Sequence, residues 1–286
     1  MDRERKLTLV AIVQTRGLEI AYERVGAGPP LVLVHGAAED GRIWQPQLAA
    51  LADAFTVVAW DEPGAGRSSD VPPHFGLADY ASCLAAVIED VALGPAHIGG
   101  ISWGGTVALE LYRRRPELVT TLILADTYAG WKGSLPAEEV RARVEAVRRL
   151  LAAPAEAFDA ALPGLFAGDP PAELVPLLAD VAAGVRPESV RVALRAMAGA
   201  DQCDVLPRIG VPTLLIWGAQ DVRSPLRIAH EFEQSIPDVE LVVIPGAGHA
   251  SNLERPVEFN RSVTEFCARH DPAAHGARFD GPPLSK

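Results

Sequence analysis

The stretch Gly99-Gly100-Ile101-Ser102-Trp103-Gly104-Gly105 decides the fold of this chain of 286 residues. An apolar run that ends at residues 96–98 leads into it, and residues 106–112, with the composition of a helix, lead out of it. A Gly-x-Ser-x-Gly pattern between a strand and a helix is typical of a sharp turn that lifts the serine hydroxyl above the edge of a sheet. Small residues flank the serine because such a turn needs unusual backbone angles and a close approach of helix to strand. We therefore predict that Ser102 is a nucleophile at the end of a strand.

Apolar runs on either side of this stretch alternate with helical segments. Continuous apolar runs are typical of strands that are buried on both faces. The expected strands cover residues 8–13, 18–25, 31–34, 55–60, 118–124, 212–218 and 240–244. The expected helices cover residues 44–52, 77–91, 226–235 and 256–269. This alternation predicts an α/β fold with a mostly parallel sheet that helices cover on both faces.

The sequence changes character near Gly130. Between residues 136 and 200 no strand-like run occurs, and apolar residues recur at helical spacing, as at Val140, Val144 and Val147. These helices are either an insertion or further helices packed on the sheet, and we favour the insertion because strand-like runs resume only afterwards. The predicted domains are a core of residues 1–130 and 206–270, a helical cap of residues 131–205, and a flexible C-terminal tail of residues 271–286.

Composition narrows the class of partner. The net charge of −11 argues against nucleic acids and anionic membranes, because both favour basic surfaces. Three cysteines without CxxC spacing indicate reduced thiols, so we expect a cytoplasmic protein. The expected partner is a small molecule, with no nucleic acid and no membrane, and a homodimer stays open.

No cofactor and no metal are expected from the motifs. The glycine-rich stretches 64–66 and 246–248 lack the third glycine of a dinucleotide-binding turn. A zinc-protease pattern begins at His230-Glu231, but Gln234 stands where the second zinc ligand is needed.

A serine nucleophile needs a base, and His249 is the candidate. It follows the last predicted strand, and catalytic residues of parallel sheets collect at the carboxyl ends of strands. The base needs a carboxylate to orient it, and both Asp126 and Asp221 follow a predicted strand. We prefer Asp221, because its loop is close to the His249 loop in the sequence. The preferred set has the chain order Ser102, Asp221, His249.

Two backbone N–H groups are candidates for binding the oxyanion that forms when a serine attacks a carbonyl. One belongs to Trp103, directly after the nucleophile, and the other to Ala37, after His35-Gly36. We expect His35 to serve the structure of its loop rather than proton transfer.

Together these residues resemble the α/β-hydrolase superfamily, and within it the branch of esterases, enol-lactone hydrolases and cofactor-free haloperoxidases. The resemblance runs from residue 18 to residue 269. It depends on His35-Gly36, Asp61-x-x-Gly64-x-Gly66-x-Ser68, the turn at Ser102, Asp221, and Gly248-His249 followed by Asn252-x-Glu254-x-Pro256. It implies an eight-stranded, mostly parallel sheet with a helical cap inserted after the sixth strand.

Two positions depart from the family pattern. Trp103 stands where Met or another medium side chain is usual, so we expect its ring to narrow or shape the pocket. Pro63-Gly64-Ala65-Gly66 replaces the more usual Arg-Gly-His-Gly.

The resemblance implies a serine hydrolase that cleaves a carboxylic ester or lactone of a small to medium apolar substrate through an acyl-enzyme. Carbon–carbon bond hydrolases of ring-cleavage products and haloperoxidase-like perhydrolases share the same three residues. A ligand receptor on this fold is the alternative outside the enzymes.

Substrate choice is expected to lie in the cap. The candidate pocket residues are Trp131, Phe158, Phe166 and Met197, together with Leu165 and Leu194. The surroundings of Asp126-Thr127 and Asn252-Leu253-Glu254 resemble those of enol-lactone hydrolases, and this resemblance implies a substrate that carries a carboxylate. The candidate cations for it are Arg141, Arg148, Arg191 and Arg195, although solvation on a helix surface is the favoured role of each.

Overall fold

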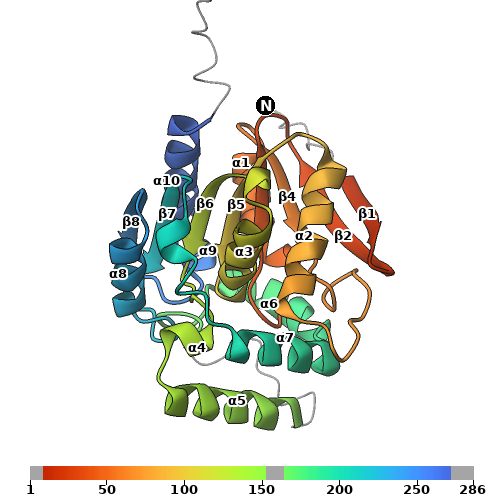
Figure 1. Cartoon of the computed structure of the whole chain (residues 1–286), viewed down its shortest axis with the longest axis vertical. Helices are drawn as coiled ribbons and strands as arrows, with labels where there is room; N and C mark the ends of the chain where they lie inside the picture. Colours follow the sequence, from red (N-terminus) through yellow and green to blue (C-terminus); the bar gives the residue numbers. More distant parts are fainter. Residues whose placement is uncertain (1–8, 153–163, 272–286) are drawn as a thin grey trace, which may run out of the picture.

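Eight strands form one sheet in the order β1-β2-β4-β3-β5-β6-β7-β8. The computed structural model describes residues 9–152 and 164–271, and Figure 1 shows the sheet with its helices. The strands are β1 (Leu9–Thr15), β2 (Leu18–Val25), β3 (Pro30–Val34), β4 (Thr56–Trp60), β5 (Ala96–Ile101), β6 (Val119–Ala125), β7 (Thr213–Gly218) and β8 (Val239–Ile244). β2 pairs antiparallel with β1 and with β4, and the other neighbouring strands are parallel. The prediction of an α/β fold with an eight-stranded, mostly parallel sheet is confirmed.

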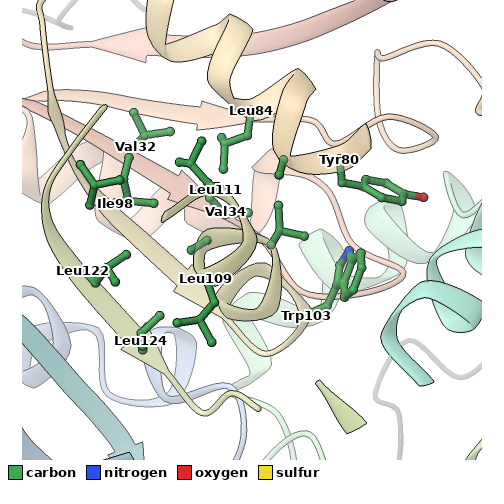
Figure 2. Close-up of a cluster of buried hydrophobic side chains, with 14 of the residues drawn as sticks. Val32, Val34, Tyr80, Leu84, Ile98, Trp103, Leu109, Leu111, Leu122 and Leu124 are labelled. Atoms are coloured by element: carbon green, nitrogen blue, oxygen red, sulfur yellow. The ribbon is translucent and has the colours of Figure 1, made fainter. Parts of the chain in front are cut away.

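Side chains of the central strands alternate between two hydrophobic clusters, one on each face of the sheet. Val32 and Val34 of β3 belong to one cluster, and Leu31 and Leu33 to the other. Figure 2 shows side chains of β3, β5 and β6 in the first cluster together with helix side chains of residues 77–91 and 103–114. The covering helices are α2 (Leu77–Val91), α3 (Trp103–Arg114) and α8 (Leu226–Ser235) for the first cluster, and α1 (Gln45–Leu51) and α10 (Pro256–Arg269) for the second. Burial on both faces explains why these strands are continuously apolar.

The chain between β6 and β7 carries helices. They are α4 (Trp131–Ser134), α5 (Ala137–Ala152), α6 (Val175–Ala183) and α7 (Pro187–Gly199). In Figure 1, α4, α5 and α7 lie below the sheet, and α5 is the farthest from it. The division of the chain into core and cap remains a prediction. Apart from Asp271, the predicted tail lies outside the described residues.

No helix within residues 9–152 and 164–271 combines the length and the apolar composition that crossing a bilayer requires.

Candidate active site

Ser102 lies in the turn between β5 and α3, in a backbone conformation that L-residues rarely adopt. Its φ is 53° and its ψ is −121°, and such a strained residue is held only where its surroundings fix it. Glycines allow the close approach. A Cβ on Gly104 would lie 2.1 Å from the carbonyl oxygen of Val34, and a Cβ on Gly100 would lie 2.5 Å from the backbone of Gly104. The Gly-x-Ser-x-Gly pattern therefore reflects sterics at the crossing of α3 with β3 and β5.

Two loops at the ends of β7 and β8 bring a histidine and a carboxylate to this serine. His249 Nε2 lies 2.9 Å from Ser102 Oγ, and His249 Nδ1 lies 2.8 Å from Asp221 Oδ2. The other oxygen of Asp221 accepts the backbone N–H groups of Arg223 at 2.8 Å and Ser224 at 2.9 Å. The carboxylate is thereby held from both sides, so its orientation toward the imidazole is fixed.

The protonation of His249 suits it to take a proton. A carboxylate only accepts hydrogen bonds, so the Nδ1 proton points to Asp221 and the Nε2 lone pair faces the hydroxyl of Ser102. Burial lowers the pKa of His249, and the charge of Asp221 opposes part of this shift. The imidazole is therefore neutral near neutral pH, which is the form that a general base needs.

Asp126, the alternative carboxylate, forms hydrogen bonds with other residues than His249. Its Oδ1 accepts the N–H of Gly218 at 2.8 Å, and its Oδ2 accepts the hydroxyl of Ser251 at 2.5 Å. Burial and the nearby charge of Asp221 raise its pKa well above the usual range. Asp126 thus joins the end of β7 to α9 (Ser251–Glu254), while Asp221 is the carboxylate bonded to His249.

The two candidate oxyanion donors, Ala37 and Trp103, flank Ser102. Trp103 is the first residue of α3, where a helix offers its N–H no acceptor. Ala37 lies in the loop after β3, and the preceding Gly36 donates its N–H to Glu39 Oε2 at 2.9 Å. Neither Ala37 N–H nor Trp103 N–H donates to a residue in the described part of the chain. Both groups are thus available to a ligand.

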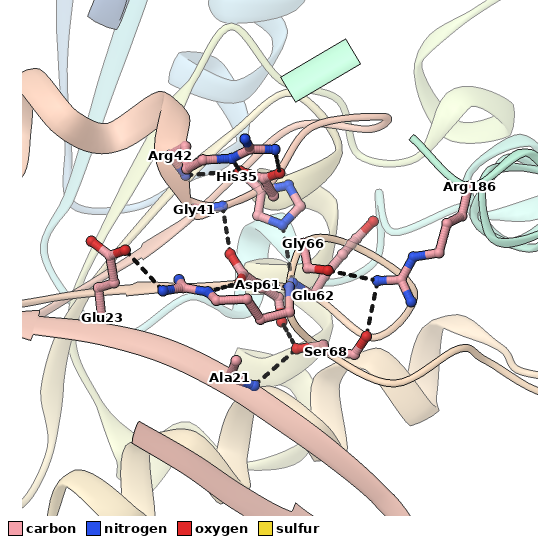
Figure 3. A network of polar contacts seen from close by, with 12 residues as sticks. Ala21, Glu23, His35, Gly41, Arg42, Asp61, Glu62, Gly66, Ser68 and Arg186 are labelled. Atoms are coloured by element: carbon pink, nitrogen blue, oxygen red, sulfur yellow. Dashed lines mark hydrogen bonds and ion pairs between the residues drawn. The ribbon is translucent and has the colours of Figure 1, made fainter. Parts of the chain in front are cut away.

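His35 is a buried part of the loop that supports Ala37. It accepts the N–H of Glu62 on Nε2 at 3.0 Å, so Nδ1 carries the proton and bonds the carbonyl of Gly36 at 2.8 Å. Burial lowers the pKa of His35. Figure 3 shows this contact beside Asp61, which accepts the N–H of Gly41 and bonds Arg67. This geometry agrees with a structural role for His35.

The Trp103 ring lies away from the cavity at Ser102, so the expectation that it narrows the pocket is wrong. The ring is fully buried, and its Nε1 donates to Glu62 Oε2 at 2.7 Å. It also stands edge-on to Tyr80, with ring centroids 5.4 Å apart. Figure 2 shows these two rings side by side. The side chain turns into the core because α3 packs against α2 at this point.

A cavity opens at Ser102 and His249. Of the predicted pocket residues, Trp131 and Met197 line it, as does Leu165. Phe166 and Leu194 are buried but are not among its lining residues. Phe158 lies outside the described residues.

The charged residues of this cavity are ones that the sequence analysis missed. Arg143, Arg223 and Glu39 line it. The arginines expected from the sequence, Arg141, Arg148, Arg191 and Arg195, are not among the lining residues. A signal for Arg223 was present, since it lies two residues after Asp221 in the same strand-end loop. Nothing in the periodicity of α5 set Arg143 apart from its neighbouring arginines.

Residues 9–152 and 164–271 contain no group of three or more His, Cys, Asp or Glu side chains placed to hold a metal ion.

Comparisons with known proteins identify the family of this chain. A family model described as the alpha/beta hydrolase fold matches residues 29–256. The chain is 30% identical over 262 residues to a putative carbamate hydrolase, RutD, of Azorhizobium caulinodans, which covers 88% of this chain and 96% of that protein.

Solved structures show the same similarity. An enol-lactonase from Burkholderia xenovorans superposes with a TM-score of 0.76 at 26% identity, over 90% of this chain and 100% of that chain. A bromoperoxidase from Bacillus anthracis superposes with a TM-score of 0.80 at 25% identity, over 92% of this chain and 100% of that chain. Because the family model spans most of the sheet together with Ser102, Asp221 and His249, the chain belongs to the alpha/beta hydrolase fold family.

Proposed function

We propose that the protein is a serine hydrolase that cleaves a carboxylic ester or lactone through an acyl-enzyme. The observation that carries the proposal is the hydrogen-bonded line from Ser102 through His249 to Asp221, with distances of 2.9 Å and 2.8 Å. A neutral imidazole between a serine hydroxyl and a buried carboxylate is the arrangement that activates a serine for attack on a carbonyl.

Each step follows from the position of these groups. His249 takes the proton of Ser102 as Oγ attacks the carbonyl carbon, and Asp221 stabilises the imidazolium that forms without taking its proton. The N–H groups of Ala37 and Trp103 bind the oxyanion. The imidazolium gives its proton to the leaving alcohol, and the neutral imidazole then activates water to release the acid and free Ser102.

The relatives support the reaction class. Their names refer to an enol-lactonase and a putative carbamate hydrolase. The ester bond of a lactone and the carbonyl bond of a carbamate are both cleaved by attack on a carbonyl carbon. The apolar wall formed by Trp131, Leu165 and Met197 favours small to medium acyl groups.

A panel of 4-nitrophenyl esters and lactones tests the proposal. We expect Ser102→Ala to lower kcat by about 10⁶-fold, because the nucleophile and its base act as one unit. Ser82→Ala, on α2, is the matched control and should keep full activity, since its hydroxyl bonds only the carbonyl of Ala78. A fluorophosphonate probe should label the wild type and fail to label Ser102→Ala. Activity that survives Ser102→Ala would refute the proposal. A protein that neither reacts with the probe nor turns over a substrate would also contradict it and would favour the ligand receptor.

A further inference from the structure

Two arginine guanidinium groups line the cavity at Ser102. One of them, that of Arg143, forms an ion pair within the protein. Arg143 forms an ion pair with Glu139 at 2.6 Å and donates to the hydroxyl of Tyr128 at 2.8 Å. Its guanidinium also lies 5.6 Å from the ring centroids of Tyr128 and Trp131. Arg143 is therefore fixed in the wall, and a ligand would have to compete with Glu139 for its charge.

Arg223 lines the same cavity, and its guanidinium has no such partner. Its side chain forms no ion pair and no hydrogen bond with any residue of the ranges 9–152 and 164–271. Its backbone, in contrast, is held on both sides. The N–H donates to Asp221 at 2.8 Å, and the carbonyl accepts Arg143 Nη2 at 2.7 Å and the hydroxyl of Tyr128. A fixed backbone thus presents a partly buried, unpaired cation beside the nucleophile.

The carboxyl group that lines this cavity lies near Arg223 but is not bonded to it. Glu39 accepts the N–H of Gly36 at 2.9 Å. Burial raises the pKa of Glu39 to about 7, so it is only partly ionised near neutral pH, and the charge of Arg223 opposes part of this shift without an ion pair between the two side chains. Asp221 has both oxygens occupied by His249 and by backbone N–H groups. The cavity therefore offers a guanidinium group that no described lining residue engages in an ion pair or a side-chain hydrogen bond.

We propose that the substrate is an ester or lactone that carries a second, free carboxylate, and that the Arg223 guanidinium binds this carboxylate while Ser102 attacks the acyl carbon. The proposal rests on the hydrolase function proposed above. The planar fork of an arginine matches a carboxylate with two parallel hydrogen bonds, and such bonds strengthen when they are shielded from water. Trp131, Leu165 and Met197 supply the apolar surface for the carbon spacer between the two ends.

The test compares two substrates of similar length that differ in one charge. The first is 4-nitrophenyl hydrogen adipate, whose chain is long enough to keep its carboxylate from attacking its own ester, and the second is 4-nitrophenyl heptanoate. The measured quantity is the ratio of kcat/KM for the charged ester to kcat/KM for the neutral one. We expect Arg223→Gln to lower this ratio by about 10- to 100-fold, the range for a lost charge-assisted hydrogen bond.

Two further variants separate the local contact from the general loss of charge. Arg141→Gln, on the exposed side of α5, removes the same charge outside the cavity and should leave the ratio unchanged. Arg223→Lys keeps a cation without the fork and should lower the ratio less than Arg223→Gln does. The backbone bonds of Arg223 persist in both replacements, so the orientation of Asp221 is retained.

Binding to Ser102→Ala, measured by calorimetry with the same two esters, separates failure of this site from failure of the hydrolase function. Tighter binding of the charged ester that Arg223→Gln abolishes supports the anion site even if the wild type hydrolyses neither ester. Hydrolysis of both esters with a ratio that Arg223→Gln leaves unchanged would refute the anion site and leave the hydrolase function standing. Equal binding of both esters to Ser102→Ala would also refute it.

Discussion

Replacement of Glu62 by glutamine should change how the stability of this protein depends on pH. Glu62 is 5% exposed, and its Oε2 accepts the indole N–H of Trp103. Burial raises the pKa of Glu62 from 4.5 to about 8, although the bond from Trp103 favours the ionised form. Glutamine has nearly the same shape and keeps an acceptor for the indole, but it cannot ionise.

The direction of the effect follows from proton binding in the two states. Between pH 4.5 and about pH 8 the folded protein keeps the proton on Glu62 while the unfolded chain has lost it. Stability therefore falls as the pH rises through this range. A pKa difference of one corresponds to about 1.4 kcal/mol, so the contribution of Glu62 declines by about 3 kcal/mol between about pH 5.5 and about pH 8.5.

Urea unfolding at these two pH values measures the change. We expect the wild type to lose about 3 kcal/mol more stability between them than Glu62→Gln loses. Glu138→Gln, which removes an exposed carboxylate from α5, is the control and should follow the wild type. Equal losses in the wild type and Glu62→Gln would show that Glu62 is ionised in the folded protein and would refute the reasoning.

Three further predictions concern the site. Asp221→Asn should lower kcat by about 10⁴-fold because the amide favours the wrong tautomer of His249, whereas Asp126→Asn should lower it far less; the reverse result would reassign the acid. The value of kcat/KM for a neutral ester should rise as His249 loses its proton, with the midpoint below pH 6.5 because burial lowers this pKa, and a midpoint above 6.5 would contradict this. Trp103→Met should lower the free energy of unfolding by about 1 to 3 kcal/mol, because a ring packed on Tyr80 is lost, and should leave the preference among neutral esters of graded length unchanged. A shift in that preference would mean that the ring acts on the cavity after all.

Much of the sheet could be predicted because the signals are local. Strands buried on both faces read as continuous apolar runs, as at residues 31–34. The observed ends differ from the predicted ones by one to a few residues. β6 begins at Val119 instead of residue 118, and α3 begins at Trp103 instead of residue 106. Helix and strand ends depend on capping and packing contacts that the apolar pattern does not contain.

The amino-acid sequence by itself determined the turn at Ser102 and the order Ser102, Asp221, His249. Glycines at positions 100 and 104 are a local requirement, because any Cβ there would collide with backbone within 2.5 Å. Such constraints are visible in a linear sequence, since they depend on which residue type stands at each position.

Only the tertiary structure decided which neighbours those residues meet. Asp126 and Asp221 both follow strands. The path of the loops after β7 and β8 places His249 within hydrogen-bond distance of Asp221 and not of Asp126. The Trp103 ring faces Glu62 and the core because of how α3 packs, although its backbone lies beside Ser102. Arg143 donates a hydrogen bond to the backbone carbonyl of Arg223, which lies 80 positions later in the sequence. The direction in which a side chain points, and the charges it meets there, follow from the packing of distant elements, which no short stretch of sequence contains.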